Sequence, residues 1–275
     1  MRVLEAALEN IRSEIRTGRM SLRAGGLAFF SFLSVFPALG LLGALYGLIF
    51  SQSDLEAQVG ALSDIIPGAS SFMGALQPVV AVAPNTLGLG AAVGLLATLW
   101  SARKGAAALI RATSLAYGVE DQRSPLGTTL AAVLISAGAI VVGALTIASL
   151  SLVPLLLDAL GSTSRSWLVV DVLRWPLVYL LLLGLTSFIY WFAPNRERPP
   201  MRWTLPAAAL VAAMLLLGSW AMTTLVGSVL NQERMYGPLA SVATVLLWLY
   251  LSSWALLMGA ELSAAVEREY AQLPR

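Results

Sequence analysis

Long stretches of hydrophobic residues alternate with short polar segments along this chain. A transmembrane helix needs about 20 mostly apolar residues. Five stretches meet that length: Leu27–Phe50, Leu126–Leu157, Leu168–Phe192, Thr204–Gly227 and Leu239–Leu262. A sixth stretch, Val79–Ser101, is interrupted by Pro84 and Asn85. We include it because leaving it out would put the two termini on opposite sides of the membrane, against the distribution of charge.

Positive charges are distributed unevenly among the segments between these stretches. Fourteen of the 17 Lys and Arg residues fall in the N-terminal segment, the second loop, the fourth loop and the C-terminal tail. The opposite side keeps only Arg165, Arg174 and Arg234. Because Lys and Arg accumulate in cytoplasmic loops, we expect a multi-pass protein of a bacterial-type inner membrane with both termini in the cytoplasm.

Two further segments have the pattern of amphipathic helices. Residues 1–26 place apolar side chains at helical spacing beside a stripe of arginines, which predicts a helix in the inner interface. We expect this helix to anchor and orient the first span, or to have a regulatory or substrate-gating role. Residues 51–78 form an outer loop with similar spacing, which predicts short helices. They fill the space between spans or form a lid over a cavity.

No linker divides the chain, so residues 1–275 are expected to form one domain. The predicted fold class is all-α: a polytopic membrane helix bundle of six transmembrane helices, with amphipathic surface helices at the inner and outer faces. The composition agrees, because 58% of residues are hydrophobic, 12% are charged and the mean hydropathy is +0.79. Soluble domains carry roughly 25% charged residues.

The residues that are absent limit the chemistry. The chain has no Cys and no His, which removes thiolate chemistry, the usual proton shuttle and the commonest zinc ligand. It contains no phosphate-binding loop and no nucleophile elbow. The basic loops lack interleaved aromatic residues for base stacking. We therefore expect no enzymatic activity, no metal, no cofactor and no nucleic-acid partner.

Short strings in a fixed order, between residues 24 and 262, resemble those of the YihY/BrkB family of membrane proteins. The strings are Ala28-Phe29-Phe30, Ser34-Val35-Phe36-Pro37, Ser101-Ala102-Arg103-Lys104-Gly105, Ala116-Tyr117-Gly118-Val119, Leu173-Arg174-Trp175-Pro176, Tyr190-Trp191-Phe192-Ala193-Pro194-Asn195, Tyr236-Gly237, Trp248-Leu249-Tyr250 and Gly259-Ala260-Glu261-Leu262. The chain departs from the family pattern at Ser114, Leu115 and Ala207. The resemblance implies a six-span inner-membrane protein. Some members are discussed as transporters of lipids or other solutes, and an older label for the family was ribonuclease.

Polar side chains at membrane depth are costly and are candidates for function. Arg174 enters the fourth span from the outer side, where it binds an anionic group or reaches the lipid head groups. Glu261 ends the sixth span, and we expect a structural or gating ion pair with Arg103 or Lys104. Pro37 is expected to break the hydrogen-bond ladder of the first span.

Three residues of the strings above, Tyr190, Asn195 and Tyr236, are added to Arg174 as candidate substrate-binding residues. The function that we expect is a transporter or flippase for lipids or for amphiphilic or anionic solutes, with membrane lipids as partners. Without a nucleotide motif, such transport would be passive or driven by a gradient or a partner. The alternative is a scaffold or assembly partner that transports nothing. The oligomeric state stays open.

Overall fold

The computed structural model describes residues 13, 16–47, 104–159, 164–196, 200–229 and 238–272. Every regular element in these ranges is a helix. The elements are α2 (Arg19–Gly47), a helix over residues 104–116, α6 (Pro125–Ala159), α7 (Ser164–Phe192), the short 3-10 helix η2 (Met201–Trp203), α8 (Leu205–Val229) and α10 (Pro238–Gln272). The expected all-α class is confirmed within these ranges.

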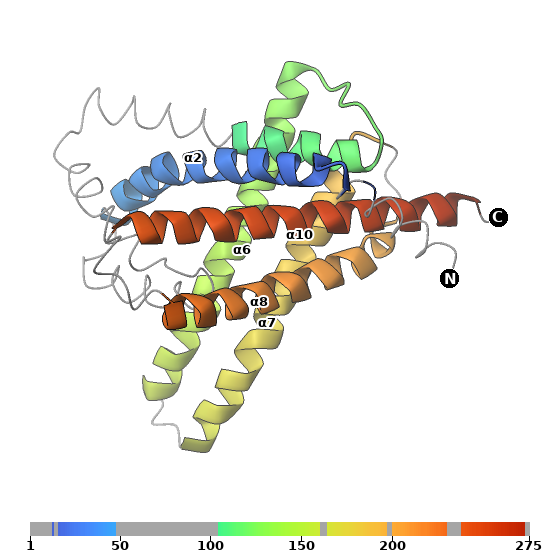
Figure 1. Cartoon of the computed structure of the whole chain (residues 1–275). Helices are drawn as coiled ribbons and strands as arrows, with labels where there is room; N and C mark the ends of the chain where they lie inside the picture. Colours follow the sequence, from blue (N-terminus) through green and yellow to red (C-terminus); the bar gives the residue numbers. More distant parts are fainter. Residues whose placement is uncertain are drawn as a thin grey trace.

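Helices α2, α10 and α8 lie roughly side by side, with α10 in the middle (Figure 1). Helices α6 and α7 form an antiparallel pair that crosses this layer at a steep angle, and α7 packs against α8. The beginnings of α2 and α8 and the end of α10 lie on one side of the molecule (Figure 1). The helix over residues 104–116 lies against α2, since the space next to Gly105 is filled by Phe30 and Ser34. The bundle therefore brings several helix ends together.

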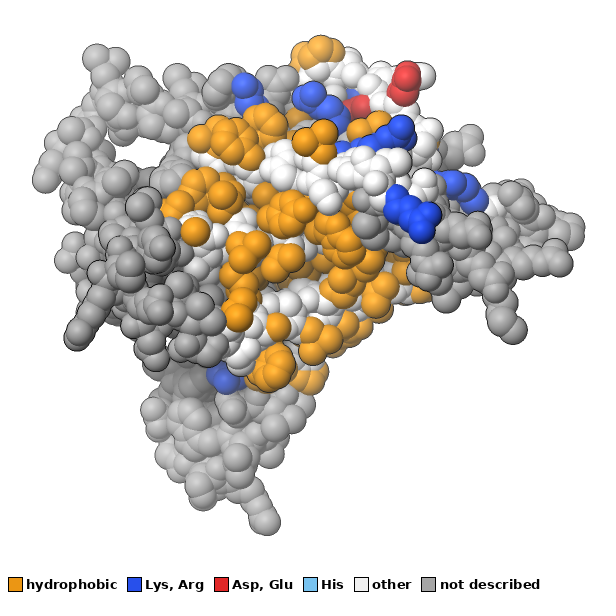
Figure 2. Space-filling model, viewed as in Figure 1, with side chains coloured by type: hydrophobic (Ala, Val, Ile, Leu, Met, Phe, Trp, Pro, Cys, Tyr) orange, Lys and Arg blue, Asp and Glu red, His pale blue; other side chains and the backbone are white. Residues whose placement is uncertain are grey.

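Four helices among the described residues are long and apolar enough to cross a membrane. The windows are Pro125–Gly143, Arg174–Phe192, Leu205–Leu225 and Val242–Arg268. They lie within or overlap the stretches predicted from the sequence. Large apolar side chains such as Leu217 and Trp220 are exposed on them, as expected where lipid is the solvent. In Figure 2 a broad hydrophobic area carries Lys and Arg mainly along one margin.

The six-span count stays a prediction, because Val79–Ser101 and the outer loop 51–78 lie outside the described residues. The first predicted span, Leu27–Phe50, largely coincides with α2, which begins at Arg19. Helix α2 therefore begins before the predicted span, within residues 1–26. A turn at Thr17 and Gly18 precedes α2, and Gly18 has a positive φ of 69°.

The chain remains helical through Pro37, so the expected break there does not end α2. Proline lacks the backbone N–H, so one hydrogen bond of the ladder is lost while the flanking turns continue. By contrast, the start of α6 follows from its sequence. The Ser124 hydroxyl accepts a hydrogen bond from the Gly127 N–H (3.2 Å), and Pro125 occupies the first helical position. Both features are typical of a helix N-terminus.

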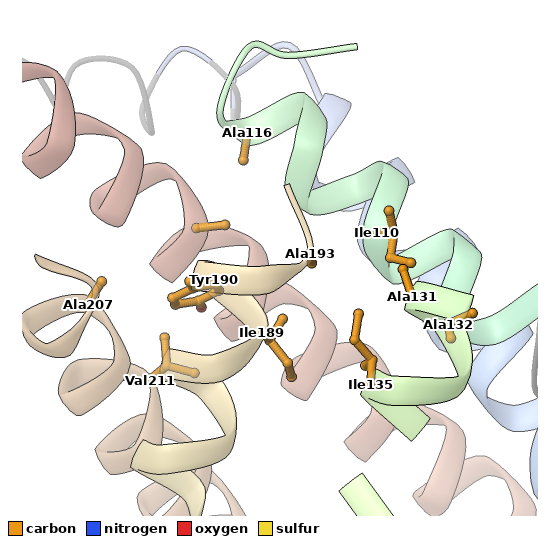
Figure 3. Packing of buried hydrophobic residues seen from close by; sticks show 12 residues of the cluster. Ile110, Ala116, Ala131, Ala132, Ile135, Ile189, Tyr190, Ala193, Ala207 and Val211 are labelled. Carbon is orange, nitrogen blue, oxygen red and sulfur yellow. The ribbon is translucent and has the colours of Figure 1, made fainter. Parts of the chain in front are cut away.

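Small residues dominate the contacts between helices. The main buried cluster joins Ile110, Tyr190 and Val211 with a set of alanines from the 104–116 helix, α6, the residue after α7, α8 and α10 (Figure 3). The alanines are Ala106, Ala116, Ala131, Ala132, Ala193, Ala207 and Ala260. Helices in lipid pack closely through such small side chains, since lipid gives apolar residues little reason to leave it.

Candidate functional site

One end of the bundle holds a group of buried polar side chains from three parts of the chain. The first part is the turn after the 104–116 helix. The N–H of Val119 donates to the carbonyl oxygen of Ser114, and the N–H of Gly118 to that of Leu115, each at 3.0 Å. Gly118 has a φ of 69°. This is a Schellman ending, which favours glycine at the left-handed position, and it places Tyr117 against the neighbouring helices.

Arg196, in the segment after α7, is the second part. Its guanidinium forms an ion pair with Glu267 of α10, with 2.6 Å between Nη2 and Oε1. The same nitrogen donates to the carbonyl oxygen of Tyr190 at 3.2 Å. The guanidinium carbon lies 4.3 Å from the centre of the Tyr117 ring. Arg196 therefore joins the end of α7, α10 and the turn at Tyr117. Both charged side chains are only 12% exposed, so these contacts are largely shielded from water.

The third part is one face of α10, on which Gly259, Ser263 and Glu267 recur at steps of four residues. A Cβ atom at Gly259 would overlap with the side chains of Val211 and Tyr190. Only glycine therefore leaves room for Tyr190. The Tyr190 hydroxyl reaches across this glycine and donates to the carbonyl oxygen of Leu256 at 2.6 Å. This contact joins α7 to α10 directly beside the ion pair.

Three hydroxyl groups at this end are buried and have no hydrogen-bond partner among the described residues: those of Ser114, Tyr117 and Ser263. Ser114 is 2% exposed and Ser263 is 0% exposed. Burial raises the pKa of Tyr117 to about 12, and the nearby Glu267 charge acts in the same direction, while Ser263 and Arg196 oppose it. These effects place the Tyr117 phenol beside Ser263, Arg196 and Glu267. A buried polar group without a partner usually indicates a bound water, ion or ligand.

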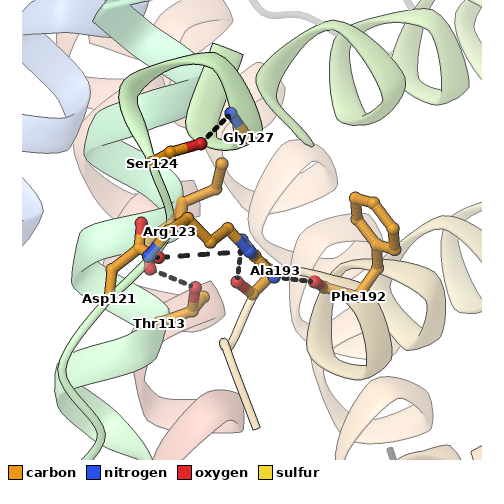
Figure 4. A network of polar contacts seen from close by, with 8 residues as sticks. Thr113, Asp121, Arg123, Ser124, Gly127, Phe192 and Ala193 are labelled. Carbon is orange, nitrogen blue, oxygen red and sulfur yellow. Dashed lines mark hydrogen bonds and ion pairs between the residues drawn. The ribbon is translucent and has the colours of Figure 1, made fainter. Parts of the chain in front are cut away.

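Two further arginines secure the helix ends around the cluster. Arg123, just before α6, donates to the carbonyl oxygens of Ala193 (2.9 Å) and Phe192 (3.0 Å) at the end of α7 (Figure 4). Its own carboxylate partner is Asp121, at 4.0 Å. Arg268 donates a longer bond, 3.5 Å, to the carbonyl oxygen of Ala116. Both cations satisfy carbonyl groups that a helix end leaves open.

Arg174 lies far from Tyr190 and Asn195, the other candidate substrate-binding residues that the structure describes. Arg174 is half-buried near the opposite end of α7, with its guanidinium carbon 5.5 Å from the Trp175 ring centre. At 1.5 Å per residue, it lies about 27 Å along the helix from Phe192. Tyr190 is fully buried in helix packing, and Asn195 is half-buried beside Arg196.

The predicted ion pair at the inner end stays a prediction. Glu261 is 6% exposed on α10, and Lys104 is exposed at the start of the 104–116 helix. Arg103 and Tyr236 lie outside the described residues. A buried ion pair that the structure does show joins Arg196 and Glu267, neither of which was selected as a candidate from the sequence. A signal was present, because Ser263 and Glu267 follow Gly259 at helical spacing and Tyr117 lies in one of the family strings.

Fold and composition together define a multi-pass membrane protein built from apolar helices. The model of the virulence factor BrkB family matches residues 11–275, so the chain belongs to this family. This confirms the resemblance found in the sequence.

Relatives with known names are also membrane proteins or carry an older enzymatic label. The ribonuclease-like protein YfkH of Bacillus subtilis is 26% identical over 256 residues, which cover 90% of each chain. A UPF0761 membrane protein of Vibrio vulnificus is 24% identical over 257 residues, 92% of this chain and 80% of its own length. Another, from Alkalilimnicola ehrlichii, is 31% identical over 189 residues, 63% of this chain but 39% of its own length. No solved structure matches the chain.

Proposed function

We propose that this protein is a transporter or flippase that moves lipids, or amphiphilic or anionic solutes, across a bacterial inner membrane without hydrolysing ATP itself. The observation that supports the proposal is the buried pair of Arg196 and Glu267 with unsatisfied hydroxyl groups beside it. Desolvating two charges costs several kcal/mol per ion, and apolar packing in the same place is often as stable. Charges kept at such a place are therefore candidates for binding a polar substrate.

The ribonuclease part of the YfkH name is not carried over to this chain. Nuclease chemistry needs a general base with a pKa near neutral pH, most often His, or a cluster of metal ligands. The sequence contains no His and no Cys. Within the described ranges, no three Asp or Glu side chains gather into a group that could hold a metal ion.

Reconstitution tests the proposal. The purified protein is placed in liposomes, and the movement of fluorescent phospholipids and of a panel of labelled anions is compared with protein-free liposomes. We expect faster movement of at least one of these, and a slower rate for Arg196→Gln. Asp121→Asn is the matched control, because it removes a carboxylate at the same end without touching Arg196. If the protein moves none of them faster than bare liposomes do, the transporter proposal is wrong.

A scaffold or assembly partner is the second candidate. The complete burial of Tyr190, one of the candidate substrate-binding residues, favours it. The hydroxyl of Tyr190 is already bonded to Leu256, and its ring is packed against Gly259. If candidate residues such as Tyr190 serve helix packing rather than substrate binding, the protein would present a rigid surface to partners. Absence of transport in the liposome assay, with the fold intact, would favour this candidate.

A further inference from the structure

The polar groups around Arg196 are mainly hydrogen-bond donors. The guanidinium carries five N–H groups, and the phenol of Tyr117 and the hydroxyl of Ser263 each add one O–H. Both hydroxyls are buried without a hydrogen-bond partner among the described residues. The acceptors that the structure shows for Arg196 are the Glu267 carboxylate at 2.6 Å and the Tyr190 carbonyl oxygen at 3.2 Å. The donor groups outnumber these two acceptors, and such an arrangement is suited to binding an oxyanion.

These donor groups belong to different elements, so only the tertiary structure brings them together. Arg196 follows α7, Tyr117 follows the 104–116 helix, and Ser263 is on α10 one turn before Glu267. The guanidinium carbon of Arg196 lies 4.3 Å from the centre of the Tyr117 ring, and its Nη2 donates to Glu267 and to the Tyr190 carbonyl oxygen. Guanidinium edges bind carboxylate and phosphate through paired hydrogen bonds.

We propose that Arg196, Tyr117 and Ser263 form a binding site for an oxyanion, a phosphate or carboxylate group, in which Glu267 occupies the anion position when no ligand is bound. Binding exchanges one acceptor for another: the guanidinium leaves the Glu267 carboxylate and pairs with the ligand, and the two hydroxyls then gain the acceptor that they lack. The inference deepens the proposed transport function by naming its substrate chemistry. It is tested by binding, so its failure can be told apart from a failure of transport.

Removing the internal competitor should tighten binding. The test uses the full-length protein in detergent and follows thermal unfolding while inorganic phosphate is added at constant ionic strength, with chloride as the reference anion. Glu267→Gln keeps the size of the side chain but removes its charge, and we expect its dissociation constant for phosphate to fall about tenfold or more, since charged hydrogen bonds are among the stronger ones. Asp121→Asn should respond as the parent does.

The hydroxyl groups supply the second arm. In the Glu267→Gln background, Tyr117→Phe and Ser263→Ala should each weaken phosphate binding by roughly tenfold, because each removes one donor to an anion. If Glu267→Gln does not fold, the same two substitutions are measured in the parent at high phosphate, where the saturating thermal shift must decrease. Vesicles of phosphatidylglycerol, in place of phosphate, distinguish a lipid head group from a free solute.

The outcomes separate clearly. A phosphate response without a lipid response assigns the site to a soluble anion, and the reverse assigns it to a lipid head group. If Glu267→Gln binds phosphate and phosphatidylglycerol no more tightly than Asp121→Asn, or if chloride produces the same shift as phosphate, the oxyanion site is wrong. Equal binding with and without the Tyr117 and Ser263 hydroxyls would overturn their part in it.

Discussion

Replacing Gly259 by alanine should destabilise the bundle strongly, although it adds a single methyl group. The new Cβ would overlap with the Val211 side chain and with the Tyr190 hydroxyl. Adding a methyl group to a packed core costs about 1–3 kcal/mol through displaced side chains. Moving Tyr190 also breaks its hydrogen bond to Leu256, and a buried polar group left without a partner costs about 1–3 kcal/mol. We expect a loss of roughly 2–6 kcal/mol.

The assay is thermal unfolding of the purified protein in one detergent, with Gly184→Ala and Gly218→Ala as matched controls. Both glycines lie inside helices, α7 and α8, and nothing lies within 4 Å of the Cβ that each would gain. In a helix interior this change should stabilise by about 0.5–1 kcal/mol. Combining Gly259→Ala with Tyr190→Phe should recover part of the loss. If Gly259→Ala unfolds at the temperature of the two controls, the close approach of α7, α8 and α10 described here is wrong.

The other predictions concern the charged end. Arg123→Ala should cost about 2–4 kcal/mol in thermal unfolding, because it leaves two carbonyl oxygens at the end of α7 without a donor; stability equal to the parent's would refute this. The pKa of the Tyr117 phenol is raised from 10.0 to about 12. Its neutral form therefore contributes stability that is complete below pH 10 and is lost as the pH rises to about 12. Tyr117→Phe should lose less stability than the parent across this pH range. A cysteine introduced at Glu120, an exposed position at the end of the bundle that holds Arg196, should react with a membrane-impermeant maleimide only after the cells are permeabilised. A cysteine introduced at Ser63, in the predicted outer loop, should react both before and after permeabilisation. The opposite pattern would reverse the predicted orientation.

The membrane class and the helical spans were predictable from the sequence. In lipid, an apolar stretch can form all its backbone hydrogen bonds only as a helix or as part of a closed barrel. The length of these stretches favours helices. This reasoning needs no knowledge of which helices are neighbours. The predicted stretches coincide with α6, α7 and α8 to within a few residues at each end, whereas α10 continues to Gln272, beyond the predicted end at Leu262. The strings that contain Tyr117, Tyr190 and Gly259 were found separately, from the resemblance to the family.

The partners of each polar residue could not be predicted in the same way. Glu261 and Arg174 stood out because a single charge beside a long apolar stretch is conspicuous along the chain. Arg196 and Glu267 lie in polar end segments among other charges, and the weak signal in the sequence was the four-residue spacing that links Glu267 to Gly259. The two residues are separated by 71 positions, and they meet because α7 and α10 contact each other and both pack against α8.

Glycine roles show the same division. Gly118 could be assigned to a helix ending from its local sequence, since a left-handed residue is a local requirement. Gly259 looked like any small residue of a membrane helix. Its necessity comes from the side chains of Val211 and Tyr190, which belong to two other helices. The backbone conformation at a helix end depends on neighbouring residues, so the sequence can predict it. The distance between two helices depends on side chains far apart in the chain, so only the tertiary structure shows where a glycine is required.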